Sequence, residues 1–134
     1  MGHLVDRTKD LGLTTELSAT RPVRFIPHAG SDALQTIRCG ILFIMAFWSG
    51  PARVAFAALK EMLMRVDPQG RLELIVVDTD ACPELYDLPE FSGNLHGKGE
   101  AAWVKDGKIV CTAFGWNPTT FETNTAGLLA KCSA

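Results

Sequence analysis

The stretch Ile41-Leu-Phe-Ile-Met-Ala-Phe-Trp-Ser-Gly-Pro-Ala-Arg53 decides how the rest of the chain is organised. Its apolar run, which follows Gly40, is typical of a strand that is buried on both faces of a sheet. Pro51 is favoured in the first turn of a helix, because the N–H that proline lacks would have no partner there. The stretch therefore predicts a central strand, a tight turn and the N-terminus of a helix, which is where α/β proteins commonly hold their functional groups.

The flanking sequence predicts an alternation of strands and helices. Strands are expected at Val23–Ile26, at Arg71–Val77 and in a hairpin of residues 100–104 and 108–114 that turns at Asp106-Gly107. Helices are expected at 33–39, at 51–66, from Asp80 through Leu85, and from Thr119 or Thr120 through Ala130. The apolar residues that recur at helical spacing in the second of these helices predict its buried face: Val54, Ala58, Leu59, Met62, Leu63 and Val66.

Length and composition indicate one globular domain. The chain has 134 residues, of which 47% are apolar and 21% are charged. Residues 1–20 are polar and weakly periodic, so we expect a loosely ordered N-terminal extension before a domain at 21–134. A net charge of −2 argues against nucleic acid as a partner. The run from Ile41 to Trp48 is too short to cross a membrane, and neither terminus resembles a secretion signal, so we expect no membrane association and a cytoplasmic location.

The four cysteines, Cys39, Cys82, Cys111 and Cys132, are widely spaced and form no Cys-x-x-Cys motif. In a cytoplasmic chain this pattern favours buried free thiols, with a disulfide as the alternative. Cys82 is the candidate reactive thiol, because it precedes Pro83 near a predicted helix N-terminus that would favour a thiolate. Neither the cysteines and histidines nor the acidic residues between 78 and 90 have the spacing of a metal site, so no metal and no cofactor is predicted.

The segment Trp48-Ser-Gly-Pro-Ala-Arg53 resembles the Trp-Cys-Gly-Pro-Cys-Lys motif of the thioredoxin superfamily. Val104-Lys-Asp-Gly107 resembles the hairpin turn Phe-Lys-Asn-Gly of that family, and Gly115 lies as far beyond this turn as the family's next glycine does. The resemblance covers residues 21–132. It implies a thioredoxin-like three-layer α/β fold, in which helices flank a mixed sheet made of a parallel βαβ half and a C-terminal β-hairpin.

The departures from the family's pattern concern its chemistry. Ser49 and Ala52 stand at the positions of the two cysteines, and neither residue takes part in disulfide exchange. The resemblance places the family's buried acid at Phe43, its neighbouring lysine at Val76 and its cis-proline at Gly99. Because all of these positions have changed, the resemblance implies a degenerate motif that has lost its activity, rather than a working enzyme in which two cysteines were exchanged.

We therefore expect a redox-inactive protein, more plausibly a binding module than an enzyme, whose partner is a protein or an extended peptide segment. A chaperone, an assembly factor or a subunit of a complex would fit. The degenerate motif Trp48, Ser49, Gly50, Pro51, Ala52 and Arg53 would form a shallow groove with the edge at Gly99 and Glu100. Within it, Arg53 and Glu100 would offer one charge of each sign for choosing among peptides.

Three alternatives stay open. In the first, the chain is a thiol-disulfide oxidoreductase whose active-site cysteines were replaced or which uses another cysteine. In the second, its surface binds nothing and Trp48 packs on the core. A hydrolytic role for Ser49 is weaker, because the candidate bases His28 and His96 lie on predicted loops with no visible orienting acid. The sequence does not define the oligomeric state.

Overall fold

The computed structural model of this chain describes residues 21, 23–26, 31–46, 48–81, 84–85, 88–91 and 97–132. The extension expected at residues 1–20 lies outside the described residues, as do Cys82, His28 and His96.

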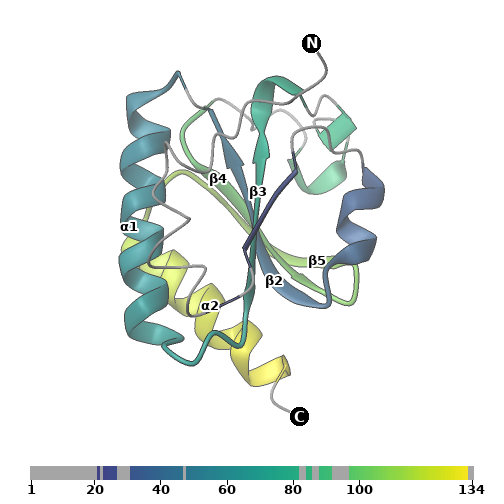
Figure 1. The fold of residues 1–134 in the computed structure, drawn as a ribbon, viewed down its shortest axis with the longest axis vertical. Coiled ribbons are helices and arrows are strands. Elements are labelled where there is room, and N and C mark those ends of the chain that lie inside the picture. The colour runs from purple at the N-terminus through teal and green to yellow at the C-terminus, as the bar shows by residue number, and fades with distance from the viewer. Residues whose placement is uncertain are drawn as a thin grey trace.

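The centre of the fold is a five-stranded mixed sheet with the strand order β1-β3-β2-β4-β5 (Figure 1). The strands are β1 (Val23–Ile26), β2 (Cys39–Met45), β3 (Glu73–Asp78), β4 (Glu100–Lys105) and β5 (Lys108–Phe114). β1 and β2 both run parallel to β3, whereas β4 runs antiparallel to β2 and pairs with β5 as a hairpin. The predicted combination of a parallel half and a C-terminal hairpin is confirmed.

Two α-helices cover one face of the sheet, and short 3-10 helices cover the other (Figure 1). On the first face, α1 (Gly50–Val66) and α2 (Pro118–Cys132) contribute Phe56 and Phe121 to a core that also holds Trp103 of β4. On the second face, η3 (Ser31–Thr36) and η6 (Pro89–Phe91) pack against the side chains of β2 that alternate with those of the first core. β2 is therefore buried on both sides, as its continuous apolar run predicts.

One predicted helix ends earlier than expected, and a second is described only in part. The segment predicted as a helix at 33–39 is the 3-10 helix η3, and Cys39 opens strand β2 because its backbone pairs with Lys105 of β4. The helix predicted from Asp80 through Leu85 crosses residues 82–83, which lie outside the described ranges; 3-10 geometry is described on either side of them, in η4 (Thr79–Ala81) and at residues 84–85.

The buried face of α1 also differs from the prediction. Leu59, Met62 and Leu63 are buried as predicted, but Val54 is 67% exposed and Ala58 and Val66 are only partly buried. The helix instead buries Ala52, Ala55 and Phe56. Ala52 and Ala55 determine which side of the helix faces the sheet. The helix approaches Gly99 so closely that only small side chains fit there: a Cβ at Gly99 would lie 2.5 Å from that of Ala55. Val54 consequently points away from the sheet and becomes available at the surface.

Candidate peptide-binding site at the start of helix α1

Ser49, at the position of the family's first cysteine, has a structural role. It is the N-cap of α1, and its Oγ accepts a hydrogen bond from the backbone N–H of Ala52 at 3.3 Å. The same hydroxyl donates to the carbonyl oxygen of Gly97 at 2.6 Å, and the residue is buried. The hydroxyl thereby joins the helix N-terminus to the segment that precedes β4. Since its proton is already donated to a carbonyl, Ser49 is not poised as a nucleophile.

Apolar residues occupy the positions at which the resemblance places the family's proton relay. Phe43 and Val76 are direct partners in the β2–β3 register, and both are fully buried. The Phe43 ring lies against that of Phe56, with the centroids 5.2 Å apart, and its Cζ would be 3.4 Å from a Cβ at Gly99. The three matched positions therefore meet in space as an apolar plug, which has no group that can carry a proton.

Gly99 itself has a backbone conformation that suits glycine. Its φ of +89° lies in the left-handed region, and a Cβ there would meet Ala55 at 2.5 Å and the Cα of Ala52 at 3.7 Å. No cis peptide bond occurs among the described residues. A proline at this position is excluded by its φ and by the crowding, so the loop before β4 has a different shape from the one that the family's cis-proline would give.

Trp48 projects from the surface beside this loop. Its side chain is 67% exposed, and its Nε1 donates a hydrogen bond to Oδ2 of Asp80 at 3.0 Å. The far edge of the indole lies over Gly97, where a Cβ would be only 2.7 Å from Cη2. The alternative in which Trp48 packs on the core is therefore wrong. The indole is fixed at its polar end and over Gly97 but leaves most of its area open to solvent.

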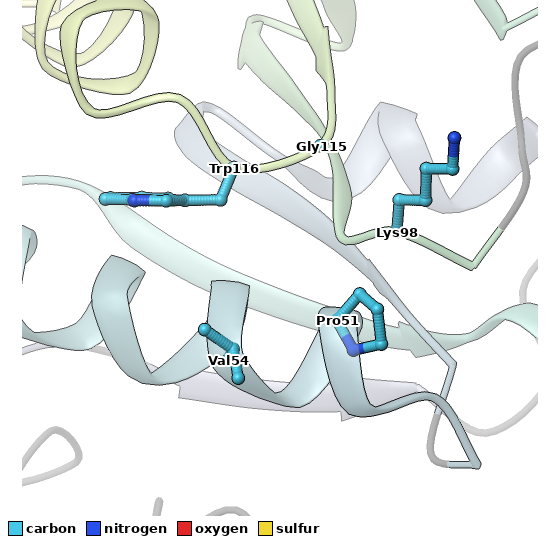
Figure 2. A pocket seen from close by; sticks show the side chains of 5 residues that line it. All are labelled: Pro51, Val54, Lys98, Gly115 and Trp116. Atoms are coloured by element: carbon cyan, nitrogen blue, oxygen red, sulfur yellow. The ribbon is translucent and has the colours of Figure 1, made fainter.

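A groove of about 550 Å³ lies next to the motif and is lined mainly by apolar groups (Figure 2). Pro51 and Val54 of α1 form one wall, and Gly115 and Trp116, between β5 and α2, form the other. Lys98 lies at one end, with its stem beside Gly115 and its amine pointing away from Pro51. The predicted motif supplies Pro51 to this groove; Val54, Lys98 and Trp116 were not predicted as site residues.

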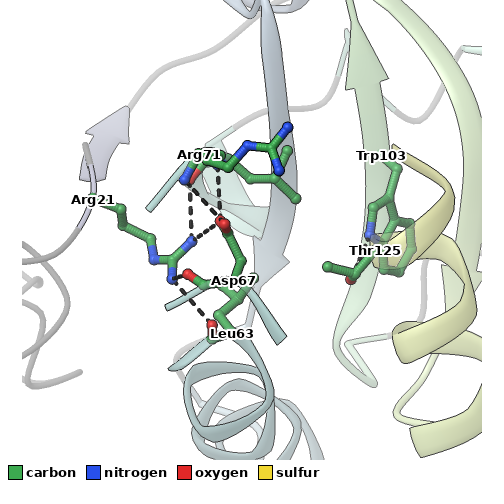
Figure 3. A network of polar contacts seen from close by, with 7 residues as sticks. Arg21, Leu63, Asp67, Arg71, Trp103 and Thr125 are labelled. Atoms are coloured by element: carbon green, nitrogen blue, oxygen red, sulfur yellow. Dashed lines mark hydrogen bonds and ion pairs between the residues drawn. The ribbon is translucent and has the colours of Figure 1, made fainter. Parts of the chain in front are cut away.

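The wall that carries Trp116 rests on a stack of aromatic rings. Trp116 lies on Phe121, with the ring centroids 4.5 Å apart, and Phe121 meets the edge of Trp103 at 5.1 Å. Nε1 of Trp103 donates to Oγ1 of Thr125 at 3.1 Å (Figure 3). That hydroxyl donates onward to the carbonyl oxygen of Phe121 at 2.7 Å. The buried N–H of Trp103 is thus satisfied, and α2 is fixed beneath the groove.

The charges beside the groove differ from those expected. Glu100 is fully buried, and its Oε2 accepts a hydrogen bond from the backbone N–H of Lys98 at 3.1 Å. The expectation that it offers an exposed negative charge is therefore wrong, because β4 begins at Glu100 and directs its side chain to the interior between Ile44 and Phe114. Lys98, the charged residue among the described groove lining, is exposed, and so is Arg53 of α1; the exposed Asp80 is bound to Trp48.

The structure also revises the prediction of free thiols. Cys39 and Cys132 form a disulfide with their Cα atoms 6.4 Å apart, because the last turn of α2 reaches the first residue of β2. Cys111 on β5 is free and partly buried. Burial raises the pKa of its thiol above the ordinary value, and the nearby charge of Lys131 offsets this only in part. The reactivity proposed for Cys82 falls outside the described residues.

The described residues include no group of three histidine, cysteine, aspartate or glutamate side chains arranged to hold a metal ion. Within the same ranges, no helix combines the length and the apolar character that a membrane span requires.

Comparison with solved structures identifies the fold. A thioredoxin from Schistosoma mansoni is 16% identical, with a TM-score of 0.60 over 80% of this chain and 98% of that one. Thioredoxin from Trypanosoma brucei brucei is 13% identical, with a TM-score of 0.63 over 86% and 97%. Desulfothioredoxin from Desulfovibrio vulgaris Hildenborough is 21% identical, with a TM-score of 0.60 over 78% and 96%. No protein-family model and no curated protein matches the sequence.

At these identities the likeness concerns the fold alone. The chain has the thioredoxin-like α/β fold, and the predicted fold class is confirmed.

Proposed function

We propose that this chain is a redox-inactive thioredoxin-like module that binds an extended apolar segment of a protein or peptide. The observation that carries the proposal is the contrast at the start of α1: the cysteine positions hold a capping serine and a buried alanine, while an apolar groove beside them stays open. An apolar groove with a few polar groups at its ends is the usual form of a binding site. A chaperone, an assembly factor or a complex subunit, located in the cytoplasm, fits this role.

Side chains, rather than added strand pairing, carry the binding in this proposal. The carbonyl of Gly97 already accepts from Ser49, and the N–H of Lys98 already donates to Glu100. Two of the backbone groups that an incoming strand would pair with are therefore occupied. Val54 and Trp116 of the groove offer apolar area instead, and burying such area supplies about 25 cal/mol per Å².

The charge beside the groove narrows the ligand class. Lys98 lies at the groove and is exposed, and its amine points away from the apolar wall. A segment that fills the groove with apolar side chains and places an aspartate or glutamate next to them satisfies both features. We therefore propose an apolar segment flanked by an acidic residue.

The alternative of an oxidoreductase that uses another cysteine is favoured by one observation, the Cys39–Cys132 disulfide. This pair lies at the beginning of β2, whereas the groove lies beyond its end. Seven strand residues at about 3.3 Å each separate the two sites by roughly 20 Å. The groove and the pocket beside the disulfide also share no lining residue, so the two features do not combine into one active site.

Val54→Glu tests the groove directly. The probe is a fluorescein-labelled ten-residue peptide with alternating leucines and an aspartate at one end, and its binding is measured by fluorescence polarisation. We expect Val54→Glu to bind the peptide about ten-fold more weakly or worse, equivalent to about 1.4 kcal/mol, because the substitution places a carboxylate on the exposed apolar wall of the groove.

Met64→Glu is the matched control. Met64 is also exposed on α1, at 44%, but does not line the groove. The Met64→Glu variant should bind the peptide like the unchanged chain. A version of the peptide with lysine in place of aspartate should bind more weakly both to this variant and to the unchanged chain. Equal losses for the two variants, or no binding of either peptide to the unchanged chain, would refute the groove.

A further inference from the structure

The Cys39–Cys132 disulfide closes the end of the molecule opposite the groove. Cys39 is the first residue of β2 and Cys132 is the last residue of α2, so the bond joins a helix end to the central strand across 93 residues of sequence. Both cysteines are partly exposed rather than sealed in the core. Both cysteines also line a pocket at this end of the sheet, so the bond lies next to the surface of the folded protein.

The pocket beside this bond has more positive than negative side chains. The pocket has a volume of about 80 Å³ and is lined by the two cysteines together with Arg38, Lys105, Lys131 and Asp106. Lys105 is the register partner of Cys39, and Arg38 and Lys131 directly precede the two cysteines. The Lys105 amine lies 3.8 Å from a carboxylate oxygen of Asp106, so one of the three cations is partly offset. Three cations against one carboxylate leave the pocket positive.

Such surroundings change the reactivity of a disulfide. Reduction converts each sulfur into a thiolate at the moment when it leaves, and a cation close to that sulfur stabilises the negative charge. The same cations attract the thiolate of an approaching reductant. A purely structural disulfide gains nothing from this arrangement, whereas a reducible one becomes faster to open.

We propose that Cys39–Cys132 is a reversibly reducible site of this chain, with a dithiol reductant as its co-reactant. The reductant's thiolate attacks one of the two sulfurs, forming a mixed disulfide while the Cys39–Cys132 bond breaks and its electron pair leaves on the other sulfur. The reductant's second thiolate then attacks the reductant sulfur of this mixed disulfide. An intramolecular disulfide forms within the reductant, and the second cysteine leaves as a thiolate. The dithiol is oxidised to a disulfide, two electrons pass to the chain, and its two protons balance the two new thiolates.

In this reaction the chain is the substrate and not the catalyst. Opening the bond releases the C-terminal end of α2 from β2. The inference goes beyond the proposed peptide groove and does not rest on it, because the two sites share no residue.

The test follows reduction of the folded protein by dithiothreitol without denaturant. Newly formed thiols are trapped with a maleimide at successive times, and mass spectrometry of peptides reports Cys39 and Cys132 separately from the other two cysteines. We expect both to be labelled while circular dichroism still shows the folded chain, and to re-form the disulfide when oxidised dithiothreitol replaces the reduced form. A bond that opens only after denaturant unfolds the chain would overturn the proposal.

Charge variants test whether the cations speed up reduction of the disulfide, or whether the bond is reduced only because it is exposed. In Arg38→Gln/Lys131→Gln we expect reduction to slow about five-fold or more, because two of the three cations that line the pocket beside the disulfide are lost. The control Lys60→Gln/Arg65→Gln removes two cations from α1 and should keep the original rate. Equal rates for the two double variants would refute the role of the cations.

Salt gives a second readout on the unchanged protein, which decides the matter if a variant does not fold. At about 1 M sodium chloride the screening length falls to about 3 Å, so we expect the reduction rate to fall toward that of Arg38→Gln/Lys131→Gln. A rate that is independent of salt would contradict the proposal.

Discussion

Ser49 illustrates how a position that carries the nucleophile in thioredoxins serves structure in this chain. Its hydroxyl caps α1 and ties the helix to Gly97, 48 residues further along. The cap is predictable from the sequence, because serine two residues before a helical proline is a common start signal. The bond to Gly97 is not, since it depends on the loop before β4, for which no local pattern exists. The same holds for Glu100, whose burial follows from the register of β4.

Cys111 provides a prediction at this scale. Because burial raises the pKa of its thiol, less of it is thiolate near neutral pH than in an exposed cysteine. We expect iodoacetamide to alkylate Cys111 more slowly than a short cysteine peptide at about pH 7.5, with the rate rising at higher pH than it does for the peptide. Peptide-resolved mass spectrometry across a pH series measures this. Faster alkylation than the peptide at neutral pH would show that the thiol is activated and would support a catalytic role for it.

At the scale of elements, the parts predicted correctly are those with a local signal. β2 has a continuous apolar run, α1 begins with proline, and the β4–β5 hairpin turns at Asp106 and Gly107, whose φ angles of 50° and 81° are both left-handed. The parts predicted incorrectly depend on distant contacts. Cys39 joins β2 through its pairing with β4, and the rotation of α1 follows from its approach to Gly99.

One ion pair connects three elements and provides a stability prediction (Figure 3). Arg21, before β1, lies 2.6 Å from Asp67 at the end of α1, and both side chains are fully or almost fully buried. Asp67 also accepts from the N–H of Leu72 at 2.9 Å, just before β3. We expect Arg21→Ala to lower the free energy of unfolding by about 3–5 kcal/mol, because it leaves a buried carboxylate without its cation.

Urea denaturation measures this change, and Arg65→Ala is the control. Arg65 pairs with Glu122 at 2.9 Å between α1 and α2, but both groups are exposed, so water replaces the lost contact. We expect a clearly smaller effect for this variant. Similar losses for the two arginines would mean that the buried network does not stabilise the start of the domain.

At the scale of the whole molecule, the thioredoxin-like fold separates two features along the central strand. The groove lies at the start of α1 and the disulfide lies at the beginning of β2. The resemblance of the motif and the hairpin turn was sufficient to predict the fold, because these landmarks fix the register of the elements. It did not predict the second wall of the groove or the disulfide, since Trp116, Lys98 and Cys132 meet their neighbours only through the tertiary arrangement.

The proposed loss of redox function at the motif is tested most directly by an insulin reduction assay in dithiothreitol. The unchanged chain is compared with Ser49→Cys/Ala52→Cys, and a working thioredoxin serves as the reference. We expect both forms of this chain to remain poor catalysts, because the restored cysteines would still face the apolar plug of Phe43 and Val76 and a glycine at position 99. A restored pair that reduces insulin as fast as the reference would contradict this account and show that the scaffold has kept its catalytic competence.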